Sequence, residues 1–167
     1  MAREAFTNPT VRAEIAHFTP ALINGPKGDG IALKAKYTVP GYPTFLILDP
    51  AGAEVDRKVG YMTPPEVTDW LGSVRSGKGT FAAVEAAFKA NSEDPAAIAA
   101  YAGKLGDRQD DAALPLYEKL LALDPENAQG YREDALSALA SHARQVASRE
   151  KKDSTGEELQ LHALMAV

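Results

Sequence analysis

The 167-residue chain contains no cysteine, and histidine and tryptophan are scarce. The absence of cysteine excludes disulfide bonds, thiolate metal sites and thiol redox chemistry within this polypeptide. The three histidines, His17, His142 and His162, are not at a spacing typical of metal ligands. The sequence therefore predicts neither a metal site nor a cofactor.

The chain also lacks a long apolar run and an excess of positive charge. No apolar stretch approaches the ~20 residues that a membrane-spanning helix needs. The formal net charge of -5 disfavours nucleic acid and an anionic membrane surface as partners, since both attract a basic face. The first residues hold no apolar segment of signal-peptide type and indicate no compartment, so localisation stays open.

Residues 1–74 combine helix and strand patterns, which predicts an α/β region. Asn8 and Pro9 mark a helix start, and Thr63 with Glu66 forms a capping box in front of another helix. The run Thr44–Asp49 is apolar and rich in strand formers, which is typical of a strand covered on both faces. The predicted elements are helix 8–18, strand 21–24, helix 31–37, strand 44–49, half-exposed edge strand 54–60 and helix 63–74.

Helical periodicity also predicts which side chains of the first and last of these helices lie in a core. Residues that share a helix face bury together when that face packs on a sheet. The predicted set is Val11, Ile15 and Phe18 on the first helix, and Val67, Trp70, Leu71 and Val74 on the last.

Residues 80–167 show only helical patterns, and segment 75–79 is a glycine-containing linker at which we expect a domain boundary. Two Asp-Pro pairs, Asp94-Pro95 and Asp124-Pro125, indicate helix starts about thirty residues apart. The predicted apolar faces carry Ile98, Tyr101, Ala102 and Leu105 on one helix, and Ala113, Tyr117, Leu120 and Leu123 on the next.

This arrangement resembles a tetratricopeptide repeat, a unit of about 34 residues in two antiparallel helices. Gln109 stands in the turn where such a repeat usually has glycine. We expect one whole repeat with a partial unit on each side, and a plain helical hairpin that only packs is the open alternative. Either would serve mainly for association. A further capping box, Ser154 with Glu157, predicts a last helix in the tail.

The segment 37–52 reads Tyr-Thr-Val-Pro-Gly-Tyr-Pro-Thr-Phe-Leu-Ile-Leu-Asp-Pro-Ala-Gly, and Gly60-Tyr61 follows the next strand. It resembles the C-terminal part of the thioredoxin fold, and the resemblance to this thioredoxin-like family covers residues 1–74. The resemblance implies that Pro43 is cis and that Tyr42, Pro43 and Thr44 form a substrate edge, where an extended protein segment pairs with the backbone. A rigid turn without a ligand is the alternative.

The family's C-x-x-C motif, which lies at a helix N-terminus and carries thiol–disulfide exchange, is missing. Met1 and Phe6 match the spacing of residues after the second cysteine, which indicates an N-terminally truncated relative. A natural variant that lost its dithiol is the alternative. Complete relatives would be thiol-disulfide oxidoreductases, whereas this chain is expected to be redox-inactive as it stands. The alternative function is a non-catalytic binding or adaptor module that uses the proline edge or the helical repeats.

The resemblance also implies that a strand absent from this chain would lie between residues 21–24 and the strand that starts at Thr44. Its absence leaves the latter strand with an unpaired apolar flank. We expect that the two strands pair directly, that another chain supplies the missing strand, or that residues 1–74 fold loosely. The expected partner is a protein or peptide, or a second copy in a homo-oligomer through the unpaired edge.

Overall fold

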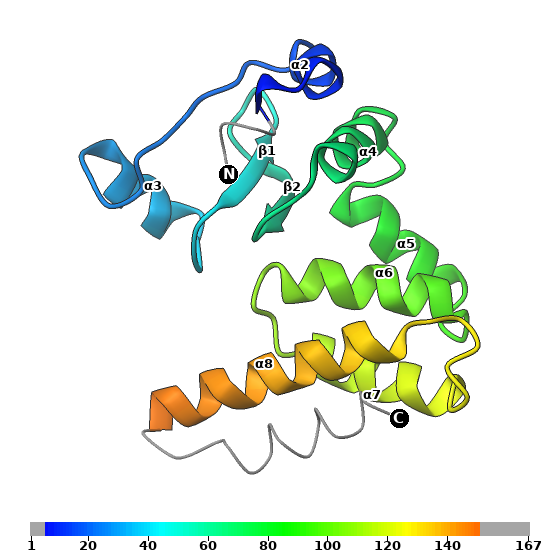
Figure 1. The fold of residues 1–167 in the computed structure, drawn as a ribbon. Coiled ribbons are helices and arrows are strands. Elements are labelled where there is room, and N and C mark those ends of the chain that lie inside the picture. Colours follow the sequence, from blue (N-terminus) through cyan, green and yellow to red (C-terminus); the bar gives the residue numbers. More distant parts are fainter. Residues whose placement is uncertain (1–5, 151–167) are drawn as a thin grey trace. The chain divides into compact units, whose positions relative to one another are not determined.

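The computed structural model describes residues 6–150, with side chains from 6 to 144, and in that range it holds helices and one two-stranded antiparallel sheet. Met1, Ser154, Glu157 and His162 lie outside the described residues. The elements follow in the order α2 (Pro9–Ile15), α3 (Asp29–Lys36), β1 (Thr44–Leu48), β2 (Glu54–Val59), α4 (Pro64–Arg75), α5 (Phe81–Ala90), α6 (Pro95–Gly106), α7 (Ala113–Leu123) and α8 (Arg132–Glu150) (Figure 1). The fold is mixed α/β.

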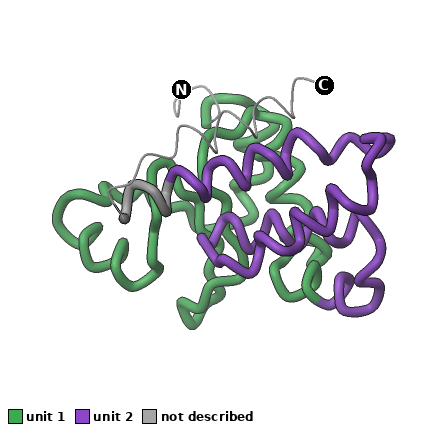
Figure 2. The backbone as a smooth tube through the Cα atoms, turned by 90° about the horizontal axis from the view of Figure 1, so that it is seen from below, with its two compact units in different colours: residues 1–85 green, residues 86–167 purple. Residues whose placement is uncertain are grey.

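The chain divides into two compact units, residues 1–85 and residues 86–167 (Figure 2). The first, unit 1, holds α2, α3, the two strands and α4, and the second, unit 2, holds α6, α7 and α8. The division falls within α5, which follows the turn at residues 76–80.

Two helices of unit 1 begin where the sequence predicts them. Asn8 caps α2, because its Oδ1 accepts the backbone N–H of Thr10 at 2.9 Å. Thr63 is the N-cap of α4, and the Glu66 carboxylate completes the capping box by accepting the backbone N–H of Thr63 at 2.6 Å. α2 ends at Ile15 and not at Phe18, which lies in the turn that follows.

The sheet is a hairpin of β1 and β2. Asp49 Oδ1 accepts the backbone N–H of Ala51 at 2.9 Å and of Ala53 at 2.8 Å, and Gly52 takes a positive φ of 79° that glycine adopts without strain. In the register, Ile47 pairs with Asp56 and Leu48 with Glu54. The residue between Glu54 and Asp56 is therefore an extra one, Val55, which forms a β-bulge.

The core of unit 1 lies between the helices and one face of the hairpin. It consists of Val11, Met62, Val67, Trp70, Leu71 and Val74, with Ile15, Phe18, Phe45, Ile47 and Val55 packed against it. The predicted core faces of both helices are confirmed. The prediction that β1 is covered on both faces is wrong, because this cluster contacts only the face of Phe45 and Ile47, and Leu48 on the other face is exposed.

The strand predicted at residues 21–24 does not form. These residues adopt neither helix nor strand, and Leu22 is 95% exposed. A strand needs a hydrogen-bonded neighbour, and within the described residues β1 pairs with β2 alone. Direct pairing of residues 21–24 with β1, the first of the three expected outcomes, is therefore wrong. The short helix predicted at residues 31–37 is α3.

In unit 2, α6 packs on α7 and α7 packs on α8. Ile98, Ala102 and Leu105 of α6 are buried as predicted, and Tyr101 stacks on Phe88 with ring centroids 4.9 Å apart. On α7 the buried residues are Ala113, Tyr117 and Leu120. The predicted burial of Leu123 is wrong, because this residue ends the helix and is 40% exposed.

The first Asp-Pro helix start is confirmed and the second is wrong. Asp94 caps α6, with its Oδ1 accepting the N–H of Ala96 at 3.2 Å. The Asp124 carboxylate instead accepts the N–H groups of Ala128 and Gln129 at 2.7 and 2.8 Å, which closes a turn. Gly130 also takes a positive φ of 77°, so the next helix starts only at Arg132.

None of the helices between residues 6 and 150 combines the length and the apolar character needed to cross a bilayer.

Candidate functional site

The outer edge of β1 is the candidate site, and we define the β1 edge as the outward backbone groups of Thr44, Leu46 and Leu48. The Pro43 carbonyl accepts the Gly60 N–H at 2.9 Å. This hydrogen bond shows which residues of β1 direct their backbone groups toward β2 and which direct them away from it. Pro43, Phe45 and Ile47 bond toward β2, so the N–H and C=O of the intervening residues point away from it. Within the described residues no strand pairs with this edge.

Tyr42 and Pro43 stand exposed at the start of the β1 edge. The peptide bond between them is cis, the geometry expected from the sequence. The Thr44 hydroxyl donates to the Gly41 carbonyl at 2.7 Å, which closes the turn behind the two residues. The structure thus brings together Tyr42, Pro43 and Thr44, the three residues singled out from the sequence.

The Tyr42 ring lies directly on the backbone of Gly25. A Cβ atom at residue 25 would stand 2.2 Å from the Tyr42 hydroxyl oxygen, so a side chain there would displace the ring from this position. On α3, Lys34 Nζ lies 5.6 Å from the centroid of the same ring, within the range of a cation–π contact. The contacts with Gly25 and Lys34 therefore hold the Tyr42 ring in place, although Tyr42 is 55% exposed.

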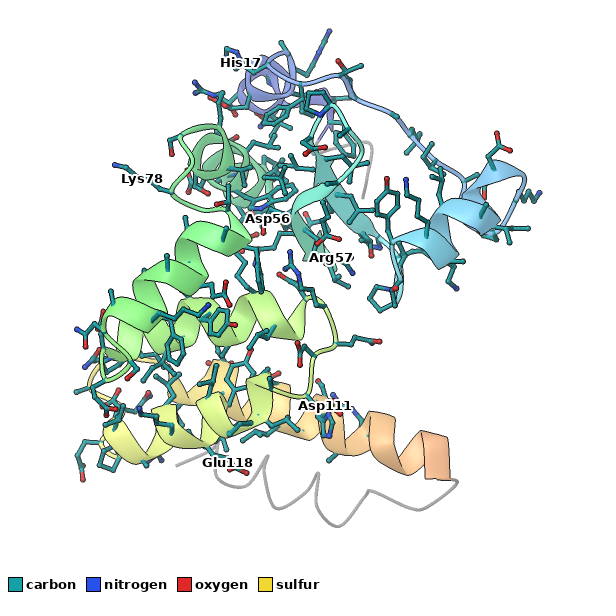
Figure 3. The ribbon with its side chains drawn as sticks, turned by 180° about the vertical axis from the view of Figure 1, so that it is seen from behind. His17, Asp56, Arg57, Lys78, Asp111 and Glu118 are labelled. Carbon is teal, nitrogen blue, oxygen red and sulfur yellow. The ribbon has the colours of Figure 1, made fainter. Side chains whose placement is uncertain are left out.

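A buried arginine of β2 holds the loop that leads to Tyr42. Arg57 Nη2 donates to the Tyr37 carbonyl at 2.8 Å, and Arg57 Nε donates to Glu54 Oε1 at 2.9 Å. Glu54 and Arg57 lie on one face of the strand, despite their odd spacing, because Val55 is the extra residue of the bulge. The guanidinium thereby links the hairpin to residues 37–38, as its location in Figure 3 illustrates.

Thr38 lies in this loop with a φ of 47°, in the left-handed region that β-branched residues avoid. The Val39 N–H donates to the Lys34 carbonyl at 3.0 Å, which is the pattern of a Schellman cap at the end of α3. Glycine is the usual residue in that position, so threonine carries strain there. Arg57 donates to the Thr38 carbonyl at 3.4 Å and helps to retain this conformation.

Asp56 lies next to Arg57 and faces the opposite side of the sheet, toward α4 (Figure 3). Its side chain is buried, and Oδ2 accepts the Trp70 indole N–H at 2.7 Å. Sequence reasoning missed both charged residues, because it read β2 as a half-exposed edge strand. The available signal was a single tryptophan on the core face of a helix, whose N–H needs an acceptor when buried.

Polar groups elsewhere are dispersed. His17 and Lys78 are exposed on the outside of unit 1 (Figure 3). In unit 2, His142 Nδ1 lies 3.6 Å from Asp111 Oδ1. No group of three or more potential metal ligands gathers in the described part of the chain.

The side chains of Glu66 and Tyr117 have a shifted pKa. The hydrogen bonds from Thr63 lower the pKa of the Glu66 carboxyl. Burial raises the pKa of the Tyr117 phenol, and the negative charges of Asp107 and Asp134 raise it further.

Exposed large apolar side chains concentrate in unit 1. Among the described residues they are Phe6, Leu22, Ile23, Ile31, Tyr42, Leu48 and Tyr61 in unit 1, and Leu123 in unit 2. Apolar surface next to a row of outward backbone groups suits the addition of a protein strand. The β1 edge can therefore pair with an extended segment, whereas the chain offers no thiol for exchange.

Comparison of the chain with protein-family models, curated proteins and solved structures gives no match. The function must therefore be argued from the site itself.

Proposed function

We propose that this chain is a thioredoxin-like protein, related to thiol-disulfide oxidoreductases, that acts without its cysteine pair as a non-catalytic binding module. Its β1 edge takes up an extended segment of a protein partner by strand addition. Tyr42, Pro43 and Thr44 mark the beginning of the binding edge.

Two features support the family part of this proposal. The first is the order of elements, in which α3 leads through the Gly-Tyr-Pro-Thr segment to β1, the Asp49–Gly52 turn, β2 and then α4. The second is the helix α2, which stands upstream at the place where the resemblance requires a helix. The Gln109 φ of 54° supports the tetratricopeptide-like reading of unit 2, because the position favours the glycine usual in that repeat.

The observation that carries the binding function is the β1 edge, with which no strand of residues 6–150 pairs. A two-stranded hairpin is marginally stable alone and gains from a third strand. Residues Thr44–Leu48 contain no charge and no proline, two of the features that natural edge strands use to prevent pairing. The bulge lies in β2, so it does not interrupt the outer edge of β1.

The edge is a better binding site than the helical unit. Leu123 is the one exposed large apolar residue among those described in unit 2, and a peptide groove needs several. The helices α6, α7 and α8 already bury their apolar faces against each other. We therefore assign unit 2 to association and the β1 edge to binding.

A proline at residue 46 tests the assignment. Leu46→Pro removes an outward N–H without removing a ladder bond to β2, and Leu46→Ala shortens the same side chain but keeps the N–H. Fluorescence anisotropy with a labelled peptide of alternating valine and threonine measures the affinity. We expect Leu46→Pro to bind at least about five-fold more weakly than Leu46→Ala, the effect of about one hydrogen bond.

A second peptide, N-methylated at every residue, keeps the test valid if the proline variant folds poorly. It cannot donate to a strand, so binding should be lost with the unmodified protein. Equal binding of both peptides, or of both variants, would refute strand addition at this edge. In an insulin-reduction assay with dithiothreitol, the chain should give no acceleration above the protein-free rate.

A further inference from the structure

The stretch 19–24 lies on the outer side of β1. Figure 1 shows this stretch running from α2 to α3 on the side of β1 opposite β2. Its ends are anchored, because Phe18 packs against the core and Gly25 lies under the Tyr42 ring. Between these anchors Leu22 is 95% and Ile23 51% exposed.

Charge favours a single extended segment over a second copy of the chain. A second copy paired through β1 would bring its own Lys34 and Lys36 against the same two lysines at the ends of the edge. A single extended segment would place alternate side chains beside Phe45 and Ile47 on one face and beside Leu46 and Leu48 on the other. The partner segment should therefore be apolar at consecutive positions.

A lysine stands near each end of the β1 edge. Lys34 is exposed over the Tyr42 ring, and Lys36 is exposed over the Tyr37 ring at 4.9 Å from its centroid. The Tyr37 hydroxyl donates to the carbonyl of Gly52, which lies in the hairpin turn. Lys36 therefore lies near the turn end of β1, whereas Lys34 lies near its start. Neither ammonium forms an ion pair with a carboxylate of the described chain.

We propose that the partner of the β1 edge is an extended segment of about five apolar residues with an aspartate or glutamate next to the end that lies beside Thr44, where Lys34 attracts the carboxylate. This inference rests on the proposed strand addition and specifies its partner.

Two labelled peptides test the partner's chemistry. Both carry a valine- and isoleucine-rich stretch of about five residues, and they differ by an aspartate or a lysine at one end. At low salt we expect the aspartate peptide to bind about five-fold more tightly, because a surface ion pair contributes at most about that much. The preference should shrink as salt approaches about 0.1 M and above, where screening acts within about 10 Å.

Matched variants on one helix identify the lysine responsible. Lys34→Gln should abolish the preference for aspartate and leave the binding of both peptides measurable. Lys36→Gln, also exposed over a tyrosine ring, should keep the preference. Loss of the preference in Lys36→Gln alone would overturn the assignment to Lys34.

The remaining outcomes separate the two proposals. If both peptides bind equally to the unaltered chain, the carboxylate inference is wrong and strand addition stands. If neither peptide binds, strand addition itself is wrong at this edge. A stable dimer in sedimentation experiments, formed in competition with the peptides, would show that a second copy occupies the edge and would overturn the choice of a single strand.

Discussion

The bond between Asp56 and Trp70 allows the stability of unit 1 to be tested sharply. Asp56 is buried and its Oδ2 accepts the indole N–H at 2.7 Å. Asp56→Ala leaves that N–H buried without its acceptor, and a hydrogen bond to a charged group contributes about 1.5–3 kcal/mol. Asp56→Asn keeps a side-chain oxygen in place for a neutral bond, so we expect it to lose only about 1 kcal/mol.

Urea unfolding followed by tryptophan fluorescence measures both losses. Trp70 is the sole tryptophan of the chain and belongs to unit 1, so the signal reports on that unit. With a urea dependence of about 1–3 kcal/mol per molar, Asp56→Ala should lower the midpoint by roughly 1 M. The reasoning is refuted if Asp56→Ala unfolds at the midpoint of the unaltered chain, or if Asp56→Asn is as damaging as Asp56→Ala.

Three further predictions concern caps and titrating groups. Gln109→Gly should stabilise unit 2 by about 0.5–1 kcal/mol in urea unfolding followed by circular dichroism, because it relieves a positive φ; a loss of stability would contradict this. The pKa of Glu66 is lower in the folded state, which stabilises that state at a pH above the carboxyl's ordinary pKa. Unit 1 should therefore lose stability as the pH falls through the pKa that Glu66 has in the folded state. Glu66→Gln should flatten that pH dependence. The raised pKa of Tyr117 stabilises the folded state below the ordinary phenol pKa, so unit 2 should lose stability as the pH rises toward the folded value, and Tyr117→Phe should lack this loss.

The elements that local signals define were predictable from the sequence. Asn8-Pro9 and the Thr63–Glu66 box start helices in the structure, and the α4 face from Val67 to Val74 is buried as its periodicity requires. Such signals depend on neighbours in sequence, so they survive without knowledge of the rest of the fold. The hairpin was predictable for the same reason, since Asp49 and Gly52 determine its turn.

Features that depend on distant partners were not predictable in this way. The apolar residues 21–24 have strand-like composition but no strand beside them, so composition alone gave the wrong result. Burial of Arg57 depends on the Tyr37 carbonyl, twenty residues away, and no local pattern encodes that contact. Of the candidate site, residues 42–44 were predicted, whereas Gly25 and Lys34 became apparent only when the fold placed them against Tyr42.

The bulge at Val55 determines where the length of this hairpin can change. Deleting Val55 would leave Glu54 and Arg57 two residues apart on a regular strand, still on a common face, so their ion pair and its hold on residues 37–38 could persist. Deleting Asp56 would instead remove the acceptor of the Trp70 indole. Insertions and deletions among natural or engineered versions of this hairpin should therefore accumulate at Val55 and spare its two neighbours.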